Sequence, residues 1–501
     1  MRTAERAPTP PTPPLGSEDH ACPWREEVRR LRSVIEALQG ELDALKRQHF
    51  GQKSEKMPSI ADALRRNGSL PPNPQAARQQ RQHNKDRQKD LPTRTIPHAV
   101  PKEKQVCPCC HSDAFKPLGP GKTTVIFEYI PMQMERQVHV RQTLVCPCGQ
   151  TILTAPGPIK VFPKGLYGPR FIAHLIVSKC ADAMGLNRLA QQFRRQGIPL
   201  SRSTLVDLFQ RSGQRLQPLG DLLLKEIAKS DVVQGDATTL QVQAKGKTRR
   251  ACLWTFLDPL KKLIGYRFSL SRNRQTACQV LGHSQGAFVG DADKAFNDIC
   301  QPGSRRRGGC MAHARRKFFE ARSVTPLAQQ ALDFILPLYA VEYEAKTAGI
   351  AGTPEHLDLR QRKSRPVMDQ FHVWLQTQQP LHTPKSLLGK AITYALNQWE
   401  PLGLFLTDAR IPIDNNLSER VLRIVAQGRK NFLFVGNEQA GHHLATLYSL
   451  VMTAIAHGLN PEDYLADVLI RIQTLPVGQL HELLPQNWKP SSPQPKIPDS
   501  S

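Results

Sequence analysis

The sequence predicts a multidomain α+β protein, and three patterns along the chain support this prediction. Leucines in heptad spacing near the N-terminus predict a coiled-coil helix. Two close pairs of cysteines predict a small metal-bound β module. A series of strand-like segments followed by a helix-like segment predicts an α/β core. With 501 residues, the chain is long enough for about two to four domains.

These patterns divide the chain into consecutive regions of different composition. The N-terminal part is rich in Pro, Thr and basic residues, and the rest alternates between strand-like and helix-like patterns. We expect a disordered tail at 1–23, a dimerisation helix at 24–66, a basic linker at 67–105, a cysteine-containing module at 106–158, a helical region at 159–228, an α/β core at 229–445 with a helical insertion at about 310–408, and a C-terminal helical segment and tail at 446–501.

The charge of the chain favours a polyanionic partner. Lys and Arg number 68 against 43 Asp and Glu, which gives a formal net charge of +25. Such an excess favours nucleic acid and predicts salt-sensitive binding. Part of it lies in residues 78–104, a linker that either follows DNA phosphates or is simply solvated. No membrane partner is expected, because no apolar run reaches the roughly 18 residues of a membrane-spanning helix.

The N-terminus and the cysteines predict a cytoplasmic protein. The first residues of the chain lack the apolar stretch of a secretory signal. Several of the 11 cysteines are scattered singly along the chain. Such usage fits a reducing compartment better than a disulfide scaffold.

Residues 24–47 carry the pattern of a short coiled coil. Leu31, Leu38 and Leu45 are spaced seven apart, and Ile35 and Leu42 form a second seam with the same spacing. We therefore expect self-association into a homodimer or a higher oligomer. The alternative is a single amphipathic helix packed on its own chain, because so few heptads are marginal alone.

Two cysteine pairs predict a zinc-finger-like module. The pairs are Cys107 with Cys110, and Cys146 with Cys148, and a strand-like stretch separates them. Four thiolates at such spacing suit a tetrahedral structural Zn²⁺ ion, which staples a domain too small for its own core. The nearby Cys109 leaves the fourth ligand open. A redox role is the alternative, but the motif does not lie in a βαβ pattern.

The helical region that follows resembles a helix-turn-helix. One helix-like run ends before Gly197, and a second begins after a cap at Ser201 or Ser203. Basic side chains suited to DNA are Arg194, Arg195 and Arg202. An ordinary pair of amphipathic helices would show the same pattern, so a DNA-reading role and a structural role both stay open.

The order of elements in the core matches a known α/β arrangement. Three strands, a helix and a fourth strand follow one another, as at the start of a ribonuclease-H-like fold. The strands are expected at 231–243, 249–258, 262–271 and 287–296, and the helix at 274–283.

Three acidic residues are candidates for one metal site in this core. Asp236 lies in the first strand and Asp291 at the end of the fourth, and these strands are neighbours in such a fold. Glu419, on a later helix, is the candidate third ligand. Carboxylates suit Mg²⁺, and a pair of such ions promotes phosphoryl transfer without a Ser, Cys or His nucleophile. Asp293 is the rival of Asp291, because it lies on the same strand face.

Glu419 also has a purely structural interpretation. In "DNNLSER" the spacing fits a capping box, with Asn416 as N-cap and Glu419 three residues on, and Glu419 would pair with Arg423. Asp414 is assigned to the loop or cap. Basic residues expected to hold DNA phosphates near this segment are Arg420, Arg429 and Lys430.

A long helical insertion is expected between Asp291 and Glu419. Residues 326–349 and 384–406 have helical periodicity. Cys310 and His313 have C-x-x-H spacing, but no second pair is evident, so we favour a structural contact of the histidine with backbone over zinc. The adjacent Arg315, Arg316 and Lys317 either meet phosphates or form a solvated basic face.

Several blocks of the sequence resemble one known family in order. These are "GDATTLQV", "FVGDADKAF", "CMAHARRKFFEA" and "IPIDNNLSERVLRIVAQGRKNFLFVGN", and they look like the corresponding blocks of the insertion-sequence-66 family of bacterial DDE transposases. "FGQKSEK", "SRSTL", "GLNPEDYLADVL" and "LHELLPQNW" extend the resemblance over most of residues 24–490. The chain departs from the family at Ala237 and Thr239, where Glu and Pro are usual, and at Ala292 and Asp293, where Gly and Tyr are usual.

The resemblance implies a nucleoid-associated bacterial transposase that binds double-stranded DNA at transposon ends and at the target. It implies that Asp236, Asp291 and Glu419 are a DDE triad holding two Mg²⁺ ions, with Mn²⁺ as a substitute, and it supports a structural Zn²⁺ on the cysteines. It leaves open accessory transposition proteins as further partners. A metal-dependent nuclease that cuts without joining, and a non-catalytic DNA-binding regulator, are the alternatives.

Overall fold

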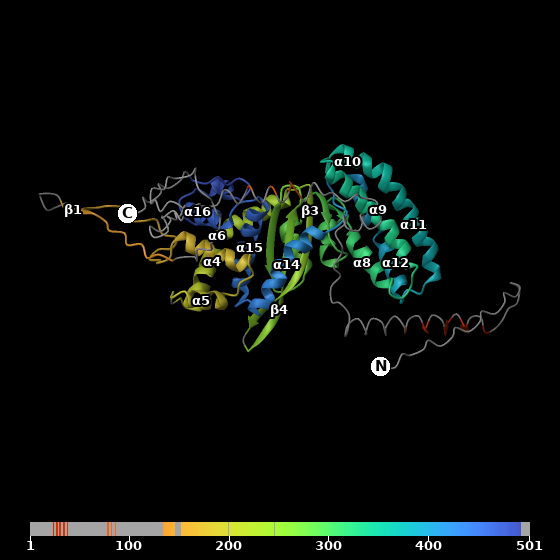
Figure 1. Cartoon of the computed structure of the whole chain (residues 1–501), viewed down its shortest axis with the longest axis horizontal. Coiled ribbons are helices and arrows are strands. Elements are labelled where there is room, and N and C mark those ends of the chain that lie inside the picture. The colour runs from red at the N-terminus through yellow and green to blue at the C-terminus, as the bar shows by residue number, and fades with distance from the viewer. Residues whose placement is uncertain are drawn as a thin grey trace, which may run out of the picture. The chain divides into compact units, whose positions relative to one another are not determined.

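The computed structural model describes residues 134–145, 152–198, 200–244 and 246–491, with single residues between 24 and 38 and between 78 and 86 (Figure 1). The chain divides into two compact units. The larger contains Met1–Ile60 and Ile159–Ser501, and the smaller is Ala61–Pro158. Among the described residues, no helix is both long and apolar enough to cross a membrane.

The smaller unit contains one short hairpin. Strand β1 (Thr143–Val145) pairs antiparallel with β2 (Ile152–Thr154). Residues 134–142 precede β1 without forming a strand, so the strand-like stretch expected between the cysteine pairs is shorter than the sequence indicated. The predicted zinc ligands and Cys109 lie outside the described residues.

The first residues of the predicted coiled coil are helical where they are described. The side chains of Leu31, Ile35 and Leu38 are 48%, 52% and 59% exposed, so their apolar seam is uncovered in the single chain. Leu42 and Leu45 lie outside the described residues. The uncovered seam is compatible with self-association, which stays a prediction.

A mixed five-stranded sheet forms the centre of the larger unit, in the order β5-β4-β3-β6-β7. Strands β3, β4 and β5 are antiparallel neighbours, whereas β6 and β7 run parallel to β3. Helix α7 (Arg274–Leu281) connects β5 to β6. The strands are β3 (Val232–Ala244), β4 (Lys247–Asp258), β5 (Leu263–Ser269), β6 (Gly286–Val289) and β7 (Arg305–Gly308).

The strands lie close to the predicted positions, with one difference. The segment expected as a strand at 287–296 pairs only as far as Val289, and its remainder forms a loop and a short 3-10 helix, Lys294–Phe296. The hairpin between β3 and β4 turns at Gly246, whose φ of +73° suits glycine. Strand β4 is buried from Ala251 onward but exposed before it, so the tip of this hairpin lies in solvent.

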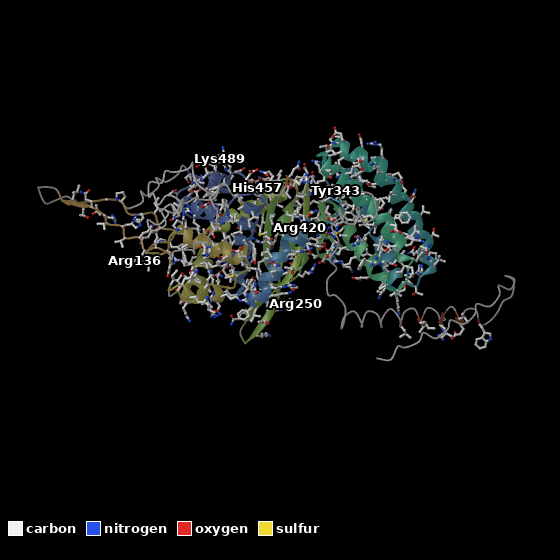
Figure 2. All side chains as sticks on the ribbon, in the orientation of Figure 1. Arg136, Arg250, Tyr343, Arg420, His457 and Lys489 are labelled. Carbon is white, nitrogen blue, oxygen red and sulfur yellow. The ribbon has the colours of Figure 1, made fainter. Side chains whose placement is uncertain are left out.

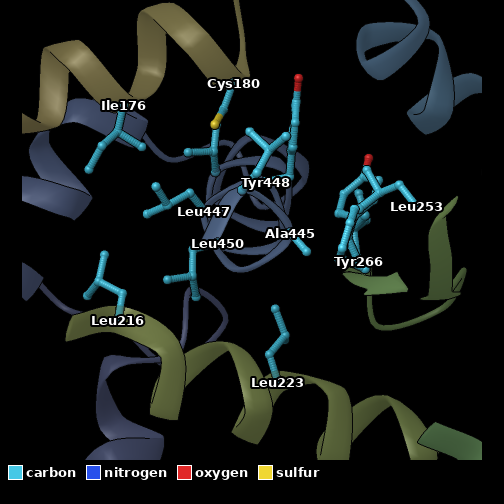
Figure 3. Close-up of a cluster of buried hydrophobic side chains, with 14 of the residues drawn as sticks. Ile176, Cys180, Leu216, Leu223, Leu253, Tyr266, Ala445, Leu447, Tyr448 and Leu450 are labelled. Atoms are coloured by element: carbon cyan, nitrogen blue, oxygen red, sulfur yellow. The ribbon is translucent and has the colours of Figure 1, made fainter. Parts of the chain in front are cut away.

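One group of helices shares a hydrophobic core with the sheet. Helix α15 is central in this core, where Leu447, Tyr448 and Leu450 lie among side chains of α4, α6 and β5 (Figure 3). Its Ser449 and Thr453 hydroxyls accept hydrogen bonds from backbone N–H groups of β5. These bonds give partners to N–H groups that would otherwise be unpaired at the edge of the sheet. The helices are α4 (Pro169–Cys180), α5 (Leu186–Arg195), α6 (Arg202–Ala228), α14 (Asn416–Phe432), α15 (Glu438–Ala456) and α16 (Pro461–Arg471), followed by a 3-10 helix, Val477–Leu483.

The helices between β7 and α14 pack around a second hydrophobic core. Val232 and Val289 of the sheet belong to this core, whereas their neighbours Val233 and Phe288 belong to the first, so the sheet separates the two. These helices are α8 (Met311–Ala321), α9 (Ala328–Thr347), α10 (Pro354–Leu359), a π-helical turn (Arg360–Ser364), α11 (Arg365–Gln378), a 3-10 turn (Gln379–Leu381), α12 (Leu387–Asn397), α13 (Trp399–Gly403) and a 3-10 turn (Leu404–Thr407).

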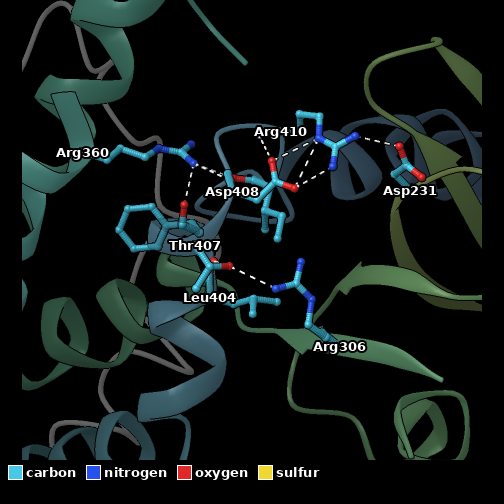
Figure 4. Close-up of polar contacts among 9 residues, drawn as sticks. Asp231, Arg306, Arg360, Leu404, Thr407, Asp408 and Arg410 are labelled. Atoms are coloured by element: carbon cyan, nitrogen blue, oxygen red, sulfur yellow. Dashed lines mark hydrogen bonds and ion pairs between the residues drawn. The ribbon is translucent and has the colours of Figure 1, made fainter. Parts of the chain in front are cut away.

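Polar contacts tie this helical insertion back to the sheet (Figure 4). Arg410 donates to Asp408 and, at 2.7 Å, to Asp231 just before β3. Arg306 of β7 donates to the Thr407 hydroxyl at 3.3 Å. These contacts fix the segment that leads from the insertion into α14.

Candidate active site

Asp236 and Asp291 lie at equivalent positions on neighbouring parallel strands. The pairing of β3 with β6 ends at Gln234 and Val289, and each aspartate lies two residues beyond its strand's last pair. Asp236 continues in the ladder with β4, opposite Thr255, while Asp291 begins a loop. The register therefore directs both backbones to one region at the edge of the parallel pairing.

Electrostatics indicates that three carboxylates approach one another here. The pKa of Asp236 is raised to about 7, chiefly by burial, and the negative charges of Asp291 and Glu419 contribute to this rise. The Ala237 backbone N–H, which donates to Asp236 Oδ1 at 2.6 Å, and the positive charge of Arg272 oppose this rise. The rise is therefore mainly an effect of burial, with a smaller contribution from the neighbouring carboxylates.

Asp293, the rival of Asp291, has structural partners. Its carboxylate forms an ion pair with Arg272 and accepts the Ala295 backbone N–H at 2.9 Å. Asp291 Oδ1 accepts only the Asp293 backbone N–H, at 3.2 Å, among the hydrogen bonds of the described residues. Asp291 is thus the freer carboxylate of the two.

The segment "DNNLSER" brings Glu419 to this region by a different route from the predicted capping box. Helix α14 begins at Asn416, and its N-cap is Asn415, which makes no side-chain cap hydrogen bond. The Asn415 amide instead donates to the Gly235 carbonyl at 3.0 Å, next to Asp236. The capping-box prediction was wrong because the helix starts one residue earlier than expected and Asn415 Oδ1, the atom that a local cap would use, accepts the Ser418 hydroxyl instead of a backbone N–H.

Asp414 has the loop role expected of it. Its carboxylate accepts the Asn416 backbone N–H at 3.0 Å and the Tyr339 hydroxyl at 2.9 Å. Its carbonyl accepts the Gln234 side-chain amide at 2.9 Å. The start of α14 is therefore attached both to β3 and to the helical insertion.

Glu419 faces α8 and does not form the expected pair with Arg423 one turn on. Its Oε1 lies 3.7 Å from His313 Nε2, and its Oε2 lies 3.8 Å from Arg316. Oε1 is buried and accepts no hydrogen bond. An orphaned buried carboxylate oxygen fits a cation that takes oxygen ligands, so Glu419 stays a candidate metal ligand.

Comparisons with known proteins identify the family. Residues 164–443 match the family model "Transposase IS66 family", residues 449–486 match "IS66 C-terminal element", and residues 104–149 match "zinc-finger binding domain of transposase IS66". The chain belongs to the IS66 transposase family. Membership implies transposase function, and with it DNA binding, and the zinc-finger match supports a structural zinc.

Relatives of this transposase occur in Sinorhizobium fredii. Uncharacterized protein y4jD is 32% identical, and the match covers 93% of this chain and 97% of the relative. Uncharacterized protein y4hP is 31% identical, and the match covers 77% of this chain and 74% of the relative. The similarity thus extends well beyond the segment that contains the carboxylates.

The predicted DNA-binding residues of the transposase fall into two classes. Most have accessible charges: Arg194, Arg195, Arg202, Arg420 and Lys430 are exposed, and Arg420 is labelled on α14 in Figure 2. Arg316 is half-exposed, while Arg315 and Lys317 lie over the rings of Phe319 and Tyr394. These side chains stay candidates for phosphate contacts.

Arg429 belongs to the second class, and its predicted role as a phosphate ligand needs correction. Its guanidinium donates to the Thr238 hydroxyl at 3.0 Å and to the Thr239 carbonyl at 2.8 Å. Both acceptors lie on β3, directly after Asp236 and Ala237. Because this guanidinium is engaged by the strand, Arg429 positions β3 in the transposase and is not a free phosphate ligand.

Sequence reasoning missed two basic residues beside the carboxylates. Arg307 of β7 donates to the Asp291 carbonyl and lies 5.4 Å from the centroid of the Phe288 ring. Arg272 pairs with Asp293. Neither has a local signal, because their partners come close only when the sheet is assembled and not through spacing along the chain.

Proposed function

We propose that this transposase cuts transposon-end DNA and joins it to a target at a Mg²⁺ site formed by Asp236, Asp291 and Glu419. The observation that carries the proposal is the geometry: Asp236 and Asp291 each lie two residues beyond the last pair of the adjacent strands β3 and β6, and Asn415 attaches the start of α14, which carries Glu419, to the Gly235 carbonyl. Carboxylates from β3, from the loop after β6 and from α14 repel one another unless a cation lies between them.

We also propose that the sheet is a ribonuclease-H-like core. Its strand order, β5-β4-β3-β6-β7, with the first three strands antiparallel and the last two parallel to β3, supports this assignment. In open sheets with parallel strands, ligands bind beyond the carboxyl ends of those strands. Asp291 lies at such an end, directly after β6.

Each residue of the proposed site has a separate task. Asp236 supplies carboxylate oxygens from β3, Asp291 supplies them from the loop after the adjacent strand β6, and Glu419 supplies one from the first turn of α14. Asn415 and Arg429 hold α14 against β3 at the two ends of the contact. Bound Mg²⁺ would stabilise the charge that develops on the attacking and leaving oxygens of the phosphodiester.

We infer that DNA phosphates follow the exposed face of α14. Arg420, Arg423 and Lys430 are exposed and succeed one another along this helix from the turn that carries Glu419. Ten residues of α-helix span about 15 Å. A row of cations of this length beside the carboxylates suits a nucleic-acid backbone.

Further partners complete the proposal. We propose that Cys107, Cys110, Cys146 and Cys148, with Cys109 as the alternative fourth ligand, hold the structural Zn²⁺, and that α5 and α6 bind transposon-end DNA. The turn at Gly197, with φ of +78°, and the Ser201 cap of α6 support a helix-turn-helix arrangement. The exposed heptad seam supports self-association through residues 24–66.

A strand-transfer assay tests this function. A pre-cleaved transposon end and a target plasmid are mixed with the transposase and Mg²⁺, and joined products are expected. Glu419→Gln should abolish both cleavage and joining. Nicked products without joined products would indicate a nuclease, and DNA binding without any Mg²⁺-dependent product would indicate a regulator.

A further inference from the structure

Cys310, His313 and Glu419 form a cluster that the proposed carboxylate site does not account for. Cys310 is the N-cap of α8, His313 lies in the first turn of that helix, and Glu419 lies in the first turn of α14. One potential ligand atom from each lies within 4.8 Å of the others. Residues far apart in the chain thus bring a sulfur, a nitrogen and an oxygen together.

Hydrogen bonding does not explain this arrangement. The 3.7 Å between His313 Nε2 and Glu419 Oε1 is too long for a hydrogen bond. Glu419 Oε1 and His313 Nδ1 are both buried without a hydrogen-bond partner, and neither ring nitrogen makes the backbone contact expected from the sequence. Two ligands bonded at about 2.1 Å to one tetrahedral ion lie roughly 3.4 Å apart, which is close to the observed separation.

The backbone holds the cluster in place without a metal. The Asn415 N–H donates to Cys310 Sγ at 3.3 Å, and the Met311 N–H donates to the Ile413 carbonyl at 3.1 Å. The starts of α8 and α14 are therefore joined directly. Cys310 is 1% exposed, whereas the side chains of His313 and Glu419 are 26% and 22% exposed, so the cluster opens to solvent on one side.

We propose that Cys310, His313 and Glu419 form a three-ligand site for a borderline divalent cation such as Zn²⁺. Thiolate and imidazole select Zn²⁺ or Co²⁺ over Mg²⁺, which requires oxygen ligands. Three protein ligands leave the fourth tetrahedral position for water or a substrate oxygen. The Cys310 thiol releases its proton as the sulfur–metal bond forms.

This site would share Glu419 with the carboxylate triad. An ion held by Cys310 and His313 takes the Glu419 carboxylate away from Mg²⁺. Added Zn²⁺ should then inhibit Mg²⁺-dependent cleavage, an expectation that rests on the proposed function. Binding of the ion does not rest on it, because binding is measured without DNA.

Cobalt spectroscopy on the full-length protein tests the site. One equivalent of Zn²⁺ per chain is added first, which the four-ligand cysteine module takes up ahead of a three-ligand site, and Co²⁺ is then titrated while thiolate-to-cobalt charge-transfer absorption is recorded. The wild type should bind an additional Co²⁺ with this absorption, and Cys310→Ser should lose it. His313→Gln should weaken cobalt binding by on the order of tenfold or more, as losses around metal sites do.

The matched control is Cys278→Ser, a partly exposed cysteine on α7 outside the cluster. This variant should titrate as the wild type does. If the thiolate-to-cobalt absorption is absent from the wild type, or if it persists in Cys310→Ser, the proposal is overturned. If Cys310→Ser fails to fold, as judged by circular dichroism, His313→Gln decides: a titration curve equal to that of the wild type would also overturn it.

Discussion

Glu342 in the helical insertion and Asp236 in the sheet are both acidic side chains removed from water, but their pKa values shift in opposite directions. Burial opposes ionisation of Glu342, yet hydrogen bonds from His356 and Arg360 lower its pKa below the usual range. Arg360 donates to both Glu342 oxygens at 2.7 Å. Burial of Asp236, with two further carboxylates nearby, instead raises its pKa to about 7.

The difference separates an acid that stabilises the fold from acids arranged for a ligand. Arg360 also donates to the carbonyls of Phe405, Asp408 and Ile411, so its charge is fully satisfied inside the insertion. Near Asp236, by contrast, Glu419 Oε1 is buried and has no hydrogen-bond partner. An unsatisfied buried group costs stability unless function requires it.

The largest expected effect is on activity at the sheet. Asp291→Asn should reduce strand cleavage by more than the roughly 100-fold that loss of an outer partner of a metal site costs, because a ligand itself is removed. Asp293→Asn is the matched control, since Asp293 pairs with Arg272 and caps a 3-10 helix. Cleavage of labelled transposon-end DNA measures both. Equal losses in the two variants would contradict the distinction between these aspartates.

The next effect is on stability, in the insertion. Glu342→Gln should destabilise the protein by about 3 kcal/mol, because it leaves the buried Arg360 without its carboxylate. Glu344→Gln, which breaks the exposed pair with Lys363, should cost less than about 1 kcal/mol. Urea denaturation measures both. A small loss for Glu342→Gln would show that the buried pair is not a stabilising element.

The two acids should also differ in how pH affects stability. Without Mg²⁺, folded Asp236 keeps its proton between pH 3.8 and about 7, whereas the unfolded chain has released it. The folded state binds more protons in this window, so the free energy of unfolding should fall as pH rises through it. Glu342, with its lowered pKa, contributes stability that is present above its unfolded pKa and is lost as pH falls.

Urea denaturation at about pH 5 and about pH 7.5 without added Mg²⁺ checks this expectation. Between the lower and the higher pH, the free energy of unfolding of Asp236→Asn should fall less than that of the wild type. The loss of stability at acidic pH, to which Glu342 contributes, should be the same in both. Added Mg²⁺ should restore wild-type stability at the higher pH, because the ion binds only the folded state. An Asp236→Asn variant with the full wild-type pH dependence would assign the effect to other groups.

The sequence predicted the features of both regions that follow from local periodicity. Alternating patterns located β3, β4 and β5, and Asp236 and Asp291 could be placed on neighbouring strands from the order of elements. Strand β6 ended earlier than predicted, because residues 290–294, which follow Val289, are of types that are depleted in strands.

Features that depend on distant partners were not predictable in the same way. Two adjacent asparagines lie at the start of α14, and the sequence alone favoured the second, Asn416, as the cap. The Gly235 carbonyl, far away in the chain, holds the side chain of Asn415. The bond from Arg429 to β3 and the approach of His313 to Glu419 likewise arise only when the sheet and α8 are assembled.

The smallest expected effects come from two residues of α14, one that positions β3 and one that is expected to bind DNA. Arg429→Lys keeps the charge but shortens the side chain, whose Nη1 donates to both the Thr238 hydroxyl and the Thr239 carbonyl, so cleavage should fall by roughly tenfold at unchanged DNA affinity. Lys430→Gln, its exposed neighbour, should weaken DNA binding and reduce the slope of affinity against salt by about one unit. Salt-dependent binding curves, recorded beside cleavage rates, distinguish the two. Loss of DNA affinity in Arg429→Lys with an unchanged cleavage rate at saturating DNA would return Arg429 to the phosphate-binding face.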